Sequence, residues 1–232
     1  MHPFNIGAGV YAEQFAALAD RYRLVSVHHP GVGRTTAAAD ITLDGIARLC
    51  HDVLRELGAE FPVHVAGWSF GALTALSFAL RYPKDTASLI LIAGSHRIGN
   101  RVGEINRLEV VAAEDFDHVI ERSGSERLRD EREALVTTLL RSESMDPQIG
   151  LRYLDVFADR PDLLARLPEI AAPTLIVQGA HDTVIPGKTA HLLHGAIPDA
   201  EYAEIADAGH FPGLTSPGAV NSIVADFLGR VS

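Results

Sequence analysis

Cysteine is nearly absent from this sequence, since Cys50 is the only one among 232 residues. A single cysteine cannot form an internal disulfide, so a reducing cytoplasm is the expected location. Cys50 falls within a helical pattern, where packing explains it better than a nucleophilic role does. No apolar run approaches the roughly 18 residues of a membrane-spanning helix, and the first residues show no signal-peptide pattern.

Basic residues are also scarce. The chain has 20 Lys and Arg against 30 Asp and Glu, which gives a formal net charge of −10. This balance argues against nucleic acid and against anionic membrane surfaces as partners. Hydrophobic residues make up 47% of the chain, as in a soluble globular protein, and the length fits one domain that carries an insertion.

The sequence does contain a regular alternation of short apolar strands and amphipathic helices. Strands are expected at residues 22–27, 63–66, 88–93, 173–179 and 203–205. Helices are expected at residues 11–21, 41–57, 72–81 and 218–228, and another begins at 189–193. Such alternation predicts an α/β fold with a mostly parallel, doubly wound sheet.

The alternation is interrupted in the middle of the chain. Residues 95–170 are rich in Glu, Asp and Arg, contain no clear strand, and look helical at 126–140 and 149–158. Because this segment lies between two predicted parallel strands, we expect a helical lid over the site, although surface helices without such a role are the alternative. The core is then made of residues 1–94 and 171–232, with the lid inserted between them.

Residues 67–71, Gly-Trp-Ser-Phe-Gly, follow an apolar strand and precede an Ala-rich helix. A strand, a sharp turn and a helix in this order are the context of a nucleophile elbow, which would expose the hydroxyl of Ser69 above the sheet. Gly67 and Gly71 lack a Cβ, so strand and helix can pass close together there. A surface turn with a chance serine is the alternative.

A serine hydroxyl is a weak nucleophile that needs a base, and the base needs an orienting acid. Ser69, Asp182 and His210 follow predicted strands in the chain order Ser, Asp, His. Parallel strands bring their carboxyl ends to one edge of the sheet, so we expect these three side chains to meet. Taken singly, Asp182 could instead be a turn former and His210 a structural loop residue.

Other histidines compete for a role. His181 adjoins Asp182 in sequence, which makes a productive pair between them improbable. His28, His29 and His64 raise a metal option, but their spacing matches no familiar ligand pattern. We therefore predict neither a metal site nor a cofactor.

These motifs together resemble those of the α/β-hydrolases over nearly the whole chain. The motifs are Gly67-Trp68-Ser69-Phe70-Gly71, His29-Pro30-Gly31-Val32-Gly33-Arg34, Gly179-Ala180-His181-Asp182 and Ala208-Gly209-His210. Within the family the chain is most similar to carboxylesterases with a helical lid, such as the methyl ester esterases that act on pimeloyl carrier-protein esters. Type II thioesterases and meta-cleavage-product C–C hydrolases are more distant.

The resemblance implies roles for further residues. The oxyanion donors would be the backbone N–H groups of Phe70 and Phe4, and the acyl pocket would be walled by the lid, Trp68 and Phe211. An orientation of Trp68 into the core is an equal alternative. The family's usual His-Gly is here His2-Pro3, which restricts the loop but removes neither donor.

The expected function is hydrolysis of a small carboxylic ester or lactone, free or linked to a carrier protein or CoA, by a monomer or homodimer. Thioester or C–C cleavage with the same triad is the alternative within enzymes. A slow-turnover small-molecule receptor is the alternative outside them, because a fold does not determine turnover.

The resemblance also implies a central strand ahead of the His2-Pro3 loop, between the 22–27 strand and the elbow strand. The chain begins where that strand should already have ended. We therefore expect the natural protein to have roughly 20–30 further residues before Met1, enough for this strand and an edge hairpin. A second chain in the slot, or a sheet that closes around it, are the alternatives.

Overall fold

A computed structural model describes residues 1–4, 6–36, 40–97, 149–150, 152–153, 156 and 162–231. Four parallel strands there form one sheet in chain order: β1 (Val63–Trp68), β2 (Thr86–Ile92), β3 (Thr174–Gly179) and β4 (Ala200–Ile205). Parallel neighbours need crossover connections, which α3 (Phe70–Arg81) supplies between β1 and β2, and α8 (Gly187–Ala196) between β3 and β4. The predicted parallel α/β sheet is confirmed.

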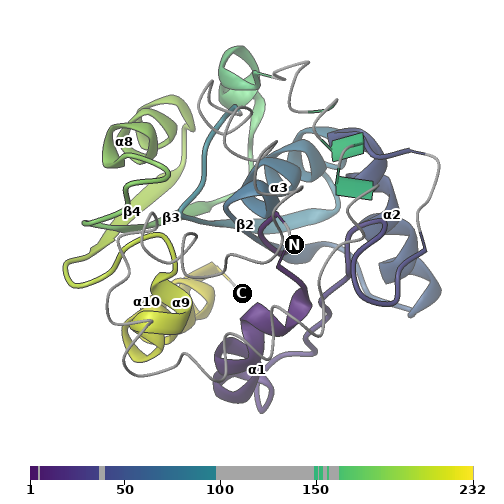
Figure 1. Ribbon diagram of the computed structural model, residues 1–232, viewed down its shortest axis with the longest axis horizontal. Helices are drawn as coiled ribbons and strands as arrows, with labels where there is room; N and C mark the ends of the chain where they lie inside the picture. Colours follow the sequence, from purple (N-terminus) through teal and green to yellow (C-terminus); the bar gives the residue numbers. More distant parts are fainter. Residues whose placement is uncertain are drawn as a thin grey trace.

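Helices cover both faces of this sheet (Figure 1). One face carries α3 and α8, with α2 (Leu43–Glu56) packed against α3. The other face carries α10 (Pro217–Val231), against which α1 (Ala12–Leu18) and α9 (Pro212–Thr215) pack. Short 3-10 turns at Ala8–Tyr11 (η1) and Leu164–Glu169 (η2) complete the described elements. None of the described helices is both long and apolar enough to span a membrane.

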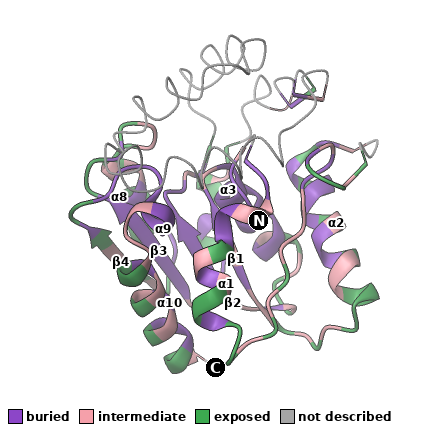
Figure 2. Cartoon of the chain, turned by 60° about the horizontal axis from the view of Figure 1, so that its bottom comes forward, coloured by how far each residue is buried: buried purple, intermediate pink, exposed green. Residues whose placement is uncertain are grey.

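Strand β2 shows why the core lies on both sides of the sheet. Leu89 and Leu91 belong to the cluster on the α3 side, whereas Ile90 and Ile92 belong to the cluster on the α10 side. Successive side chains of a strand point to opposite faces, so a continuously apolar strand supplies both clusters. Each such buried side chain contributes about 1.5–3 kcal/mol. In Figure 2 the central strands are coloured as buried, whereas the outward sides of α2 and α10 are coloured as exposed.

The bounds of α2 follow from its caps. The Thr42 hydroxyl accepts a hydrogen bond from the backbone N–H of Gly45 at 3.0 Å, as an N-cap does. At the other end Gly58 has φ +64°, a conformation that glycine adopts without steric cost and that commonly ends helices. The predicted helix over 41–57 is therefore confirmed, shorter by a residue or two at each end.

The predicted strand at residues 22–27 was wrong. This segment pairs with no strand among the described residues. Its apolar pattern is strand-like, yet a ladder requires a neighbouring backbone within hydrogen-bond reach. On its outer edge β1 instead meets Met1, whose ammonium donates to the Ala66 carbonyl at 2.8 Å and whose carbonyl accepts from the Trp68 N–H at 3.2 Å.

Strand β4 begins earlier than predicted, at Ala200 rather than Ala203. It is the edge strand beyond β3, and its residues Glu201 and Glu204 are exposed. The apolar pattern therefore marked only the end of a strand whose start is set by pairing with β3, where Thr174 lies opposite Ala200.

Little of the predicted lid falls within the described residues, and the predicted helix at 126–140 lies outside them. The two ends of the insertion meet, because Arg97 and Asp162 form an antiparallel bridge. The buried His96 ring bonds the Asp162 carboxylate at 2.8 Å. Ile149 and Tyr153 pack against the core on the α3 side.

Candidate active site

Ser69 lies at the turn between β1 and α3, with φ 55° and ψ −117°. A positive φ in a residue other than glycine costs about 1–3 kcal/mol and persists only where its surroundings impose it. Here the Ser69 N–H donates to the Ile92 carbonyl at 2.9 Å, and a Cβ on Gly67 would collide with the Gly71 carbonyl. This is the strained, close-packed turn that the motif predicts.

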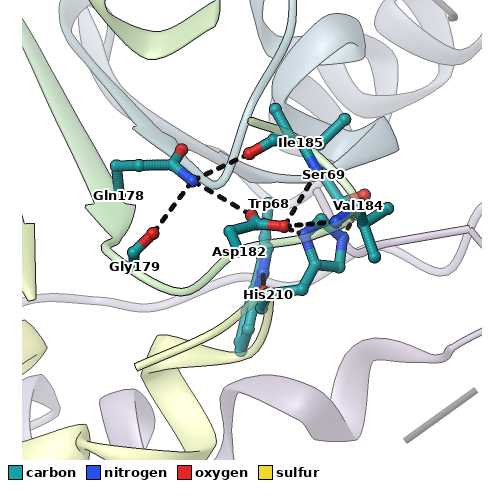
Figure 3. A network of polar contacts seen from close by, with 8 residues as sticks. All are labelled: Trp68, Ser69, Gln178, Gly179, Asp182, Val184, Ile185 and His210. Carbon is teal, nitrogen blue, oxygen red and sulfur yellow. Dashed lines mark hydrogen bonds and ion pairs between the residues drawn. The ribbon is translucent and has the colours of Figure 1, made fainter. Parts of the chain in front are cut away.

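The structure brings the three predicted triad residues together (Figure 3). His210 Nε2 lies 2.9 Å from Ser69 Oγ, and His210 Nδ1 lies 2.9 Å from Asp182 Oδ2. An ionised carboxylate only accepts hydrogen bonds, so the proton of the neutral imidazole belongs on Nδ1. Nε2 is then left with its lone pair toward the Ser69 hydroxyl, which is the arrangement of a general base.

Asp182 is held at both carboxylate oxygens. Its Oδ1 accepts from the backbone N–H groups of Val184 and Ile185, each at 2.8 Å. Its Oδ2 accepts from Gln178 Nε2 at 3.1 Å as well as from His210. The Asp182 side chain is fully buried, and a buried charge is tolerated only where such donors satisfy it. The turn after β3 thus folds around the carboxylate.

Trp68 and Phe211 do not lie where the pocket prediction placed them. Both side chains are buried in the core cluster on the α10 side, with ring centroids 5.8 Å apart. The indole N–H of Trp68 donates to the His210 carbonyl at 2.9 Å. Alternation along β1 turns this residue toward that face, so the core orientation is the correct one. Trp68 supports the loop that carries His210.

Phe4 and Phe70 lie near each other beside the elbow, with ring centroids 6.3 Å apart. Tyr153 contacts both rings, at centroid distances of 5.7 and 5.8 Å, and its hydroxyl donates to the Pro30 carbonyl at 3.0 Å. Sequence reasoning placed Tyr153 in a helix but gave it no role. Only its apolar spacing from Ile149 hinted at burial.

The His2 side chain links the loop that contains Pro3 to the loop that contains His29. Its Nε2 accepts from the His29 N–H at 2.8 Å, so its Nδ1 carries the proton that bonds the Pro3 carbonyl at 2.8 Å. The His2 and His29 rings stack with centroids 3.8 Å apart, and the buried His29 Nε2 has no hydrogen-bond partner in the part of the chain that the structure describes. Burial lowers the pKa of His2 to about 3 and lowers the pKa of His29 well below its usual value.

The buried pair of His2 and His29 predicts that the free energy of unfolding falls at acid pH. Unfolded histidine takes up protons near pH 6.5. In the folded protein burial lowers the pKa of His2 to about 3 and the pKa of His29 well below its usual value, so both rings stay neutral as the pH falls below 6.5. The unfolded state therefore binds more protons as pH falls below about 6.5, and the free energy of unfolding falls with it. Replacing His29 by Phe keeps a ring in the stack and should reduce this loss by about 1 kcal/mol per pH unit between pH 6 and 4.

Urea unfolding of the wild type and the His29→Phe variant across this pH range measures the difference in slope. The His194→Phe variant, changed at an exposed position of α8, is the control and should keep the wild-type slope. Equal slopes for all three proteins would contradict the prediction.

The other histidines and Cys50, which the sequence offered as alternative reactive residues, do not form a second site among the described residues. His181 is exposed, and His64 bonds Ser88 Oγ at 2.8 Å, apart from the stacked His2 and His29. Within the described part of the chain no three His, Cys, Asp or Glu residues are grouped to hold a metal ion. Cys50 is buried in α2, and burial raises the pKa of its thiol to about 11, so it is unsuited to act as a thiolate.

Comparison with known sequences gives related enzymes. The pimeloyl-[acyl-carrier protein] methyl ester esterase of Yersinia enterocolitica is 27% identical over 240 residues, covering 98% of this chain and 91% of the esterase. Polyketide synthase ThaQ of Burkholderia thailandensis is 30% identical over an alignment of 230 positions that covers 94% of this chain and 11% of the synthase. The chain thus corresponds to a small part of that relative.

Solved structures agree on the fold. The enol-lactonase of Burkholderia xenovorans LB400 superposes with a TM-score of 0.88 at 22% identity, over 98% of this chain and 89% of the lactonase. A family model described as the alpha/beta hydrolase fold matches residues 4–217. Because that match spans most of the sequence, the chain belongs to the α/β-hydrolase fold family.

Proposed function

We propose that this carboxylic ester hydrolase works through an acyl-enzyme on Ser69. His210 takes the Ser69 proton as Oγ attacks the ester carbonyl, and it returns that proton to the departing alkoxide. Water, activated by the same imidazole, then releases the acid. The observation that carries this proposal is the His210 ring, which hydrogen-bonds Ser69 Oγ and Asp182 Oδ2 at once, at 2.9 Å each.

Asp182 maintains the tautomer and stabilises the imidazolium that forms during attack. Its buried carboxylate with fixed N–H donors is already organised for that charge, so little reorganisation is required. For the oxyanion we assign the backbone N–H groups of Phe70 and Phe4. The assignment of Phe70 is supported by its position directly after Ser69, at the start of α3. The assignment of Phe4 is supported by its ring, which packs near that of Phe70.

For the substrate we propose a small ester or lactone, free or attached to a carrier protein. The support is the named activity of the Yersinia relative, whose substrate is a methyl ester on an acyl-carrier protein. We also retain the proposal that residues 95–170 form a lid. Its support is the antiparallel bridge of Arg97 and Asp162, which places the two ends of the insertion side by side.

A series of p-nitrophenyl esters of increasing acyl length, paired with thioesters of the same acids, tests the bond that is cleaved. We expect ester hydrolysis with kcat/KM of at least about 10⁴ M⁻¹s⁻¹ for the best chain length, and weaker thioester cleavage. A higher kcat/KM for thioesters would reassign the protein as a thioesterase. One burst of product followed by almost no turnover would instead favour a receptor.

A further inference from the structure

Gln178 is a polar side chain in the middle of the sheet. It is the penultimate residue of β3, is fully buried, and lies next to the Asp182 turn (Figure 3). Its Nε2 lies 3.1 Å from Asp182 Oδ2, 3.0 Å from the Ile185 carbonyl and 3.3 Å from the Gly179 carbonyl. Gln178 and His210 thus both bond the Oδ2 atom of Asp182.

The orientation of this amide follows from its neighbours. All three atoms around Nε2 are oxygens that accept hydrogen bonds. Turning the amide over would place Oε1 against the Asp182 carboxylate and two carbonyls, which is repulsive. The N–H groups of Gln178 therefore point at Asp182 and at the loop that follows it.

Packing alone does not explain a glutamine here. Oε1 is buried and has no hydrogen-bond partner among the described residues, and an unsatisfied buried acceptor destabilises the fold. Methionine has nearly the same length and would fill the space without an unsatisfied oxygen. What methionine would lack is the pair of N–H donors toward Asp182 and Ile185.

We infer that Gln178 is a positioning residue, which holds Asp182 Oδ2 in line with His210 Nδ1 and ties the Asp182 loop to β3. The backbone N–H groups of Val184 and Ile185 hold Oδ1, and Gln178 holds Oδ2. Ile185 also accepts from Gln178, so the carboxylate and the loop that binds it are anchored to one strand. Because both of its oxygens are held, the Asp182 carboxylate cannot rotate freely, and it keeps the His210 imidazole directed at Ser69. The inference rests on the proposed function of the triad.

Replacing Gln178 by Met removes the donors and keeps the volume. We expect kcat for the best p-nitrophenyl ester to fall about tenfold to a hundredfold, as for other small losses of alignment. KM should stay within about twofold, because the Gln178 side chain is fully buried and its amide bonds Asp182. The far-downfield proton NMR signal of the His210 Nδ1–H should shift or broaden. A role in stability alone would move neither kcat nor this signal.

Gln14→Met is the matched control. Gln14 is also a buried glutamine whose Oε1 has no partner within the described residues, and its Nε2 donates to the Gly213 carbonyl at 3.1 Å. This variant should keep wild-type kcat and the wild-type signal, whatever its melting temperature. Gln178→Asn, which retains the amide but falls short of Asp182 by one methylene, should lose kcat as the Met variant does.

The outcomes separate the inference from the proposed function. If the folded Gln178 variants keep kcat within about twofold of an active wild type and show an unchanged downfield signal, the positioning role is wrong. If the wild type itself hydrolyses no ester, the proposed function fails. The NMR signal then still reports whether Gln178 organises the pair of Asp182 and His210.

Discussion

Replacing Ser69 by alanine is expected to lower ester turnover about 10⁶-fold without unfolding the protein, as loss of the nucleophile does in other serine hydrolases. The hydroxyl is the group that His210 Nε2 contacts at 2.9 Å. Without it no acyl-enzyme can form, and only binding and the oxyanion donors remain to assist water. Alanine also tolerates the turn no worse than serine, because both carry a Cβ at φ 55°.

Steady-state kinetics of ester hydrolysis measure the loss of turnover. The mass of the intact protein after treatment with a serine-directed phosphonate shows whether position 69 still forms a covalent adduct. The wild type should gain one adduct, on Ser69, and the variant none. Ser88→Ala is the matched control, because Ser88 is a buried serine whose Oγ lies 2.8 Å from a histidine, His64, on β1. It should keep full activity and the adduct. Undiminished hydrolysis by the Ser69→Ala protein would end the acyl-enzyme proposal.

Replacing Asp182 by asparagine should lower kcat about 10⁴-fold, for a reason that the hydrogen bonds specify. The N–H groups of Val184 and Ile185 both point at Oδ1, so the amide oxygen of asparagine must occupy that position. Its NH₂ group then replaces Oδ2 and faces His210 Nδ1. Two donors cannot share a hydrogen bond, so the ring would place its proton on Nε2 and could no longer accept the Ser69 proton.

The effect should appear in kcat, with KM little changed and the fold intact by circular dichroism. Asp85→Asn is the matched control. Asp85 bonds the Nε2 of the buried His51 at 2.9 Å, and its carbonyl meets Val63 at the start of β1, whereas Ser69 follows the other end of that strand. This site is an Asp–His pair without a serine, so its Asp→Asn variant should keep wild-type kcat. A comparable loss of activity in both variants would point to general damage instead of tautomer control.

Some of this protein could be predicted from its sequence. The strands that pair in the sheet, the amphipathic helix within residues 41–57 and the Gly-x-Ser-x-Gly turn depend on local rules, namely side-chain periodicity and the conformational freedom of glycine. Parallel topology then implied that Ser69, Asp182 and His210 would share one edge of the sheet, and the structure places His210 within hydrogen-bond reach of both Ser69 and Asp182. Each step needed only a short stretch of chain and a rule of connection.

Other features required the tertiary structure. The strand-like residues 22–27 form no strand, since pairing is decided by a neighbour and not by apolar pattern. Likewise Trp68 faces the core, although the sequence left either orientation open.

Gln178 and Tyr153 belong to no sequence motif, because their roles depend on partners that only the fold brings to them. Gln178 meets Asp182 because the chain turns back after β3, and Tyr153 meets Pro30, which is distant in sequence. The sequence by itself determined the periodic elements and the order of the reactive residues. Only the tertiary structure decided which side chains support them, because hydrogen bonds and burial depend on which groups the folded chain brings together.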